Sequence, residues 1–439
     1  MNLSNLLTPT YFTIIVLISF LFKGANDFFV ILIFHLFLIT YYFFAFKKEN
    51  PIQINRIGII FLIFLIFQIL PLPGSILKSI SPNSFSLYNQ LYENKYFAVS
   101  LSLQESITYF FIFLSGFLIM SIISKIIHNK RDLRKVMKVI MWFAVLQSMF
   151  GIIIYFFDFK QILFFYEKNY YMESVTGTFI NRNNFSFYLL ISFIVSTSYL
   201  EFYKKYFFKN DKLNIFNFLL SELFLIRLAI LIIAIGILLT KSRAGNITFF
   251  IILFSIFALD IYKYRKFTFI SISVISIVLI DLIILSNILG GEKTIERLAL
   301  TSFEGERSRI EVFQLGIKEF MNYPIFGYGM GGFEVLYDLK YNVKYLFYDH
   351  VHNDFIEYLG ELGIVGFVIL FISFPLFIFF HIKKSSMPSE LKQLSLFCFM
   401  AILIHGNLDF ALHIPANIFL LFLIYGICLS DALNNKYAI

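Results

Sequence analysis

The chain contains about twelve apolar runs of roughly twenty residues each, and this pattern limits what it can fold into. A helix of that length crosses the hydrocarbon core of a bilayer, which is about 30 Å thick. Hydrophobic residues make up 59% of the 439 residues and charged residues only 15%, which is too apolar for a surface that faces water. We therefore predict an all-α polytopic membrane protein. The predicted spans cover residues 9–22, 28–46, 57–72, 106–124, 136–157, 184–203, 219–240, 246–262, 267–289, 362–380, 394–411 and 414–432.

Basic residues follow every second predicted span. Lys and Arg are enriched in the cytoplasmic loops of membrane proteins, so this alternation predicts the orientation of the chain. It places both termini in the cytoplasm and the other loops on the opposite face, which is periplasmic or extracellular. The same placement accounts for the formal net charge of +8 without nucleic acid as a partner. The basic segments are KKENPIQINR, KIIHNKRDLRK, KKYFFKND, KYRK and HIKKSSMPSELK.

The largest predicted outer loop covers residues 290–361, between the ninth and tenth spans. Loops longer than about 12 to 15 residues are usually functional or disordered. This one contains SRIEVFQLGIKEFMNYP, in which apolar residues recur at helical spacing, and Pro324 with the glycines near it predicts where that helix ends. We therefore expect a large helical periplasmic loop, with any chemistry on the outer face.

Two histidines and several acids lie close together in DHVHNDFIEYLGELG, residues 349–363. His350, His352 and Asp354 form an H-x-H-x-D pattern, whose residue types are possible metal ligands. The pattern lacks a further histidine and a clear remaining ligand set, so we favour a site without metal. His352 is a candidate general base, because imidazole titrates near neutral pH. An interfacial histidine without a catalytic role is the alternative.

The same segment also indicates the start of an apolar helix. Asn353 or Asp354 is the expected N-cap, because a short side-chain oxygen can accept from the first free backbone N–H groups. Phe355, Leu359 and Leu362 recur at helical spacing, so we expect them to form the buried stripe. In the preceding GYGMGG stretch the glycines formally match a nucleotide-binding pattern, but no strand precedes them. A Gly-rich turn that lets the backbone approach a ligand or a lipid headgroup is the better interpretation, and a plain reversal of the chain is the alternative.

Three arginines lie in predicted outer loops, where positive charge is normally depleted. Arg182 and Arg243 stand at the outer ends of spans, and Arg309 lies in the large loop. Each alone could anchor a helix end to the membrane surface. Guanidinium groups also bind phosphate in a bidentate and permanently charged manner, so three on one face suggest a phosphorylated ligand.

Ionisable residues at membrane depth leave a transporter as an alternative. Asp281 falls within the ninth predicted span, and His35 and His405 also fall within spans. Such residues are functional candidates by default. No internal repeat or matched pair of broken helices supports this alternative.

Taken together, several segments resemble the O-antigen ligase and polymerase superfamily, the integral membrane glycosyltransferases with a Wzy-C or O-antigen-ligase domain. They extend over roughly residues 176–417. On this basis we divide the chain into amino-terminal transmembrane helices, 1–175, and a catalytic region, 176–432, that includes the periplasmic loop. The matching segments are GTFINRNNFSFYL, LLTKSRAGN, RIEVFQLGIKEFMNYPIFGYGMGGF, HVHNDFIEYLGELGIVGF and HGNLDFALHIPAN.

The resemblance implies a metal-independent, inverting transfer of a glycan from undecaprenyl diphosphate to an acceptor hydroxyl. It implies no cofactor, and a site on the periplasmic face of the bacterial inner membrane. His352 matches the family's essential loop histidine and would activate the acceptor. Arg243 and Arg309 match arginines that would hold the diphosphate, and Arg182 is a further contact of the donor. Phe313 stands where the family often has Trp.

The acceptor is left open by the resemblance. A ligase would move a finished O-antigen onto lipid A-core in lipopolysaccharide biosynthesis, whereas a Wzy-type polymerase would move the growing chain onto the next carrier-linked repeat. We expect the ligase and keep the polymerase as the alternative. A protein-glycosylating ligase, a transporter and a non-catalytic scaffold are the remaining hypotheses.

Overall fold

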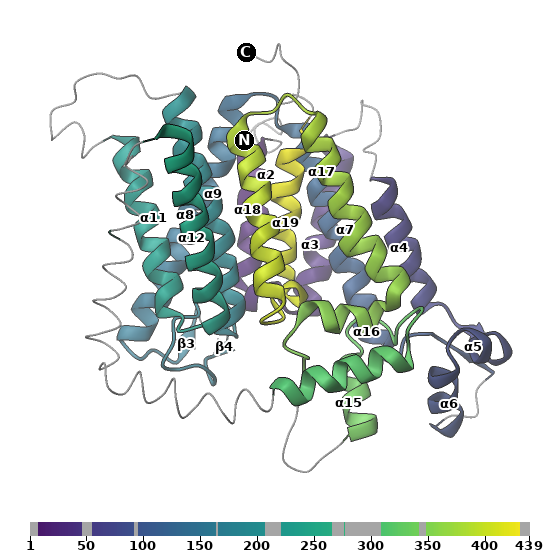
Figure 1. Cartoon of the computed structure of the whole chain (residues 1–439). Coiled ribbons are helices and arrows are strands. Elements are labelled where there is room, and N and C mark those ends of the chain that lie inside the picture. Colours follow the sequence, from purple (N-terminus) through teal and green to yellow (C-terminus); the bar gives the residue numbers. More distant parts are fainter. Residues whose placement is uncertain are drawn as a thin grey trace.

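A computed structural model describes residues 8–45, 55–91, 95–163, 166–206, 221–265, 276, 309–341 and 348–430. Its long helices run side by side, and smaller elements gather at one end of the resulting bundle (Figure 1). The helices of the bundle are α2 (Pro9–Ile18), α3 (Phe28–Ala45), α4 (Arg56–Ile69), α7 (Leu103–Ile126), α8 (Lys130–Phe156), α9 (Arg182–Tyr206), α11 (Glu222–Leu239), α12 (Arg243–Tyr264), α17 (Phe374–Lys384), α18 (Ser389–Gly406) and α19 (Pro415–Cys428).

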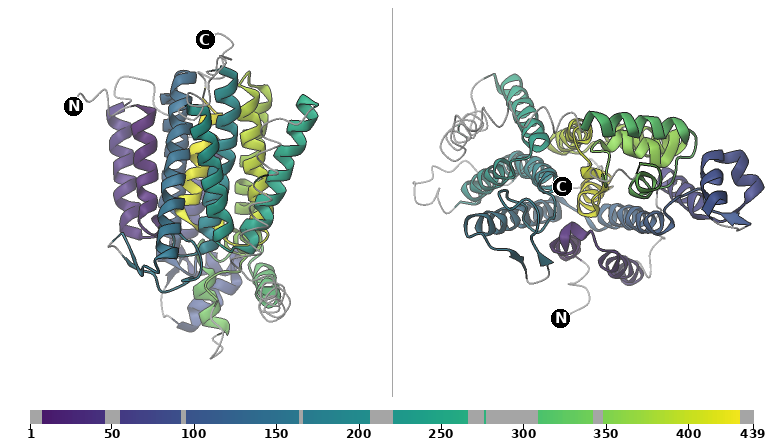
Figure 2. Two further views of the ribbon diagram at one scale, coloured as in Figure 1. Left: turned by 90° about the vertical axis from the view of Figure 1, so that its left-hand side faces the viewer. Right: turned by 90° about the horizontal axis from the view of Figure 1, so that it is seen from below.

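The smaller elements define what we call the loop end. A helix over residues 309–322 lies across this end, as both side views show (Figures 1 and 2). We call the opposite end, where α8 begins and α9 ends, the basic end. The labelled elements at the loop end are α5 (Gly74–Ile80), α6 (Pro82–Leu91), α15 (Phe333–Tyr341), the start of α16 (Asp354–Phe367) and two small antiparallel pairs, β1 (Leu72–Pro73) with β2 (Tyr96–Phe97) and β3 (Gln161–Ile162) with β4 (Tyr166–Glu167).

The helices support a multi-pass membrane protein. Within the described ranges, six helices are long and apolar enough to cross a bilayer, and four shorter apolar helices accompany them. Every predicted span but the ninth overlaps one or more described helices. The ninth, residues 267–289, lies outside the described residues apart from Ser276. The all-α class is thus confirmed, and the number twelve stays a prediction.

Helix α19 forms the centre of the bundle. Every one of its residues is buried, and it lies near the middle when the bundle is seen from below (Figure 2). It packs against α7, where Gly116 faces Phe422 and Gly426 faces the backbone of Met120. Glycines at these positions let the two backbones approach closely, as is common between membrane helices. Helices α7 and α19 lie on opposite sides of the predicted domain boundary at residue 175, yet they share one core. The boundary therefore does not mark a break in packing, and the division into two regions remains a prediction.

Ion pairs join helices at the basic end. Glu222 of α11 pairs with Arg134 and Lys138 of α8, and Glu390 of α18 pairs with Lys205 of α9. The predicted cytoplasmic loops connect these helix ends, so their basic residues also hold neighbouring helices together.

Helix α16 has the predicted N-cap but a different buried face. The side chain of Asn353 accepts from the backbone N–H of Ile356 at 3.1 Å, as a cap does. Leu362 is buried, but Phe355 and Leu359 are only half-buried, so the predicted apolar stripe was wrong for two of three residues. This stretch lies at the loop end and turns its polar face inward, where histidines meet it. The large polar residues of its buried face are Asp354, Glu357, Tyr358 and Glu361.

Helix α16 also bends where the tenth span was predicted to begin. Gly363 has φ 61° and ψ −175°, outside helical geometry, so the helix changes direction there before continuing through a π-helical segment (Val368–Ser373) into α17. The bend packs against GYGMGG through backbone hydrogen bonds from Tyr328 N to Gly360 O, 3.1 Å, and from Gly329 N to Glu361 O, 3.0 Å. The glycines therefore allow close approach to another backbone.

We predict that Gly327→Ala destabilises the fold. Gly327 has φ 71°, and an added Cβ would overlap the carbonyl of Glu361. The left-handed backbone alone costs a non-glycine residue about 1–2 kcal/mol, and the overlap adds to this. The apparent melting temperature of the purified protein in detergent should fall clearly. Gly74→Ala is the control, because its Cβ would come no closer than 3.1 Å to the ring of Phe85. Equal melting temperatures for the two variants would contradict the prediction.

Candidate functional site

The hairpin between α18 and α19 supplies a buried carboxylate at the loop end. Asp409 is fully buried, and its Oδ1 accepts from the backbone N–H of Phe410 at 2.9 Å. The side-chain amide of Asn183 donates to Oδ2. The backbone of Asp409 also accepts from Asp354 N at 3.1 Å, which ties the hairpin to the start of α16.

His352 faces this carboxylate. Its Nδ1 lies 3.4 Å from Asp409 Oδ1, and its ring packs edge-on against Phe410. The backbone of His352 is left-handed, with φ 58°, a conformation that costs a non-glycine residue free energy and that is enriched at functional sites. The imidazole keeps 23% of its side-chain surface exposed, so one edge is open to a ligand.

The surroundings of Asp409 favour its charged form. Burial raises the pKa of Asp409, but the hydrogen bond to His352, the neighbouring histidines and the backbone N–H of Phe410 together lower it below its usual value. A carboxylate beside Nδ1 favours the tautomer that carries the proton on that nitrogen. The lone pair is then on Nε2.

The structure brings two of the predicted arginines close to Asp409. Arg309 Nη2 lies 3.9 Å from Asp409 Oδ2, and this side chain is 38% exposed. Arg182 donates to Ser174 Oγ at 3.2 Å and stacks its guanidinium over the ring of Tyr171. It is near enough to Arg309 and Asp409 to interact with their charges.

Arg243, the third predicted arginine, comes from a different helix. It is the exposed first residue of α12, and it lies within electrostatic reach of Arg182. The three arginines therefore come from α9, α12 and the helix over residues 309–322, as the sequence analysis proposed for one shared face. Their roles toward a ligand remain predictions.

The H-x-H-x-D pattern does not converge on one point. His350 Nδ1 lies 2.6 Å from Glu357 Oε1, whereas His352 faces Asp409. Asp354 bonds instead to His413 Nδ1, at 2.8 Å, and to the backbone N–H of Leu412. The three side chains thus have three different hydrogen-bond partners.

A second cluster of ionisable groups lies behind His352. His413 is fully buried, with its Nε2 3.2 Å from Glu361 Oε2 and 3.5 Å from Glu357 Oε1. Burial lowers the pKa of His413, but Glu357, Asp354 and Glu361 outweigh it and hold the pKa well above its usual value. His350, Glu357 and His413 are arranged so that they could hold a cation.

Sequence reasoning missed Asp409 and His413. Both belong to HGNLDFALHIPAN, which was matched to a family but given no role. Asp409 fell within a predicted span, residues 394–411, although α18 ends at Gly406. Ionisable residues at a break between two apolar runs were the available signal.

The residues that suggested a transporter are not brought together in the part of the chain that the structure describes. His35 Nδ1 lies 2.9 Å from Ser115 Oγ, and His405 packs against Phe187. Asp281 lies outside the described residues.

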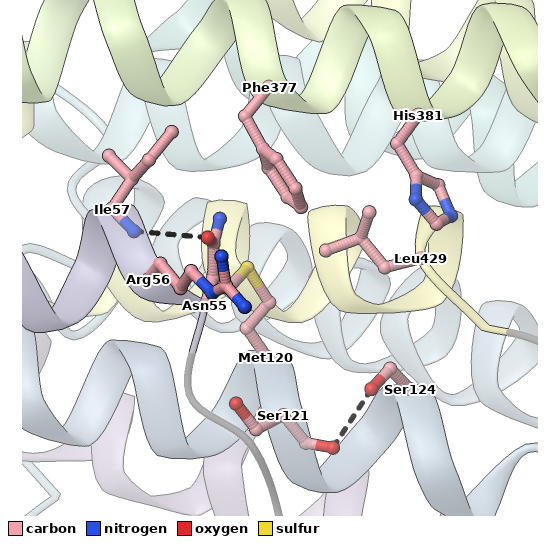
Figure 3. A pocket seen from close by; sticks show the side chains of 9 residues that line it. All are labelled: Asn55, Arg56, Ile57, Met120, Ser121, Ser124, Phe377, His381 and Leu429. Atoms are coloured by element: carbon pink, nitrogen blue, oxygen red, sulfur yellow. Dashed lines mark hydrogen bonds between the residues drawn. The ribbon is translucent and has the colours of Figure 1, made fainter.

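A pocket of about 480 Å³ lies at the basic end, far from His352. Figure 3 shows Arg56 and His381 on its walls, with Ser121 and Phe377 between them. Its place at the opposite end separates it from the candidate site.

We predict that Asp354→Ala strongly destabilises the protein. The change leaves the buried His413 without its Nδ1 partner and the backbone N–H of Leu412 without an acceptor. Breaking a buried charged pair typically costs about 3–5 kcal/mol. Thermal unfolding in detergent measures the loss, with the exposed Asp349→Ala as control. A melting temperature for Asp354→Ala equal to that of the control would refute the prediction.

Comparison with known proteins supports the resemblance. A family model described as O-antigen ligase (Wzy_C) matches residues 228–371. The match begins in α11 and includes Arg243, Arg309 and His352, while Arg182 and Asp409 lie outside it. A search of curated proteins found no match. The resemblance to this superfamily is thereby confirmed, because residues 228–371 are similar to the O-antigen ligase family.

Proposed function

We propose that this protein is a membrane glycosyltransferase that moves a glycan from undecaprenyl diphosphate to a hydroxyl of lipid A-core, as an O-antigen ligase does. The family match supports a ligase or polymerase type of reaction. The observation that carries the proposal is that His352 and Arg309 meet at one buried carboxylate, Asp409. The charge pattern supports a periplasmic site at the inner membrane, because the loop end lies opposite the basic end.

His352 acts as the general base in this proposal. With Nδ1 facing Asp409, Nε2 takes the proton of the acceptor hydroxyl as its oxygen attacks the anomeric carbon. The bond between that carbon and the diphosphate oxygen breaks on the opposite side, so the configuration inverts. Asp409 orients the ring and stabilises the imidazolium that forms, as a buried carboxylate does beside a catalytic histidine.

The arginines stabilise the leaving group. Undecaprenyl diphosphate departs with negative charge on two phosphates, and catalysis requires donors placed where that charge develops. Arg309 and Arg243 approach from separate elements, so they can contact the two phosphates, and Arg182 lies near enough to both to interact with their charges. In this mechanism guanidinium groups, which are permanently charged, neutralise the diphosphate.

His352→Ala should lower the rate of glycan transfer by about 10²–10⁴, because a positioned base contributes that much. The assay uses the purified protein with a carrier-linked donor and lipid A-core, and follows the glycosylated product. His381→Ala, at the basic end, is the matched control and should keep full activity. Unchanged transfer by His352→Ala would exclude this residue as the base.

Arg309→Lys gives a separate signature in the same assay. The charge remains but the bidentate geometry is lost, so transfer should fall while the protein stays folded. Arg56→Lys is the control at the far end of the bundle.

Omitting one acceptor at a time distinguishes ligase from polymerase. With carrier-linked repeats alone, a ligase leaves the donor unchanged until lipid A-core is added. Chain growth on carrier-linked repeats alone would replace our proposal with polymerase activity. A solute flux into proteoliposomes that survives both His352→Ala and Arg243→Ala would overturn the enzyme proposal in favour of a transporter.

A further inference from the structure

Five ionisable side chains meet behind His352 without taking part in the proposed transfer. They come from three segments: the turn before α16, α16 itself, and the short helix Ala411–His413 of the hairpin. Four are almost or fully buried, and only His350 keeps appreciable exposure, at 23% of its side chain. We call them the His-carboxylate cluster, and its members are His350, Asp354, Glu357, Glu361 and His413.

The atoms of this cluster converge. One ligand atom from each of His350, Glu357 and His413 lies within 4.8 Å of the others. Glu361 Oε2 is a fourth nearby donor atom, 3.2 Å from His413 Nε2. In a tetrahedral zinc site with bonds of about 2.0–2.2 Å, neighbouring ligand atoms lie about 3.3–3.6 Å apart. The pair of His413 Nε2 and Glu357 Oε1, at 3.5 Å, already has this spacing, and the pair of His413 Nε2 and Glu361 Oε2, at 3.2 Å, is slightly closer.

One polar atom of the cluster has no partner among the described residues. Glu361 is fully buried, yet its Oε1 makes no hydrogen bond, although Oε2 of the same carboxylate faces His413. An unpaired buried carboxylate oxygen is costly and needs a physical explanation. A divalent cation held by this cluster can bind that oxygen.

The outer partner of the cluster is also in place. His413 Nδ1 lies 2.8 Å from Asp354 Oδ1, while its Nε2 points at Glu357 and Glu361. A histidine that binds a metal through one nitrogen usually donates from the other to a carboxylate, which fixes its tautomer. Asp354 has that position relative to His413.

We propose that the His-carboxylate cluster is a structural site for a divalent transition-metal ion such as Zn²⁺, held by His350, Glu357, His413 and Glu361. Imidazole and carboxylate ligands suit this class of ion. Binding displaces the proton shared by His350 and Glu357, whose atoms then separate from their present 2.6 Å. The ion joins the turn that carries His352 to α16 and the hairpin, and it touches none of the reacting groups.

The test is metal binding by the purified full-length protein in detergent, stripped with a chelator and titrated with Co²⁺ and then Zn²⁺. We expect one Co²⁺ per chain, visible absorption bands of a tetrahedral site, displacement by Zn²⁺ and a rise in melting temperature. Asp354→Asn should weaken binding about 10–100-fold as an outer partner. Glu357→Gln should weaken it further.

Two more variants keep the test decisive. His350 is partly exposed, so His350→Gln should fold even where Glu357→Gln does not, and it should lose the tetrahedral spectrum. His35→Gln alters a buried histidine elsewhere, bonded to Ser115, and should bind like the unaltered protein. The proposal is overturned if the unaltered protein shows no saturable binding, or if binding is unchanged in His350→Gln. Glycosyl transfer is not part of the readout, so the result is independent of the proposed reaction.

Discussion

The loop end depends on the contact between α16 and the hairpin that joins α18 to α19. Asp354 bonds to His413 and to the backbone of Leu412, and Tyr358 donates to Leu412 O at 2.8 Å. These are buried, charge-assisted or backbone-directed interactions, so they tolerate little displacement. They hold the start of α16 against Asp409, and thereby set where His352 stands.

The candidate site extends from that contact toward the surface. Asp409 is buried and paired, His352 is half-buried beside it, and Arg309 is the most exposed of the three. Exposure to solvent thus increases from a buried carboxylate to accessible cationic groups. This arrangement suits the proposed reaction, in which a charged lipid substrate arrives from outside. The ion pairs at the basic end join neighbouring helices and take no part in this proposed chemistry.

Much of this could be predicted from sequence, and the failures have a common cause. Apolar runs, basic loops, the Asn353 cap and the helix before Pro324 are local signals, and the structure agrees with them where it describes those residues. The inward face of α16 was predicted from the rule that apolar side chains are buried. That rule failed because Glu357 and Glu361 face His413, which lies more than fifty positions later, and one sequence does not reveal such a pairing.

The bend at Gly363 also governs how parts of the molecule can move. At this bend, backbone hydrogen bonds join the segment from Pro324 to Gly329 to α16. Gly316 of the preceding helix packs against Val351 and Ile356. The helix that carries Arg309 and the turn that carries His352 are thus joined by direct contacts. Arg243 stands on a separate transmembrane element, α12. A shift of α12 would therefore move Arg243 relative to His352 and Arg309 without breaking those contacts.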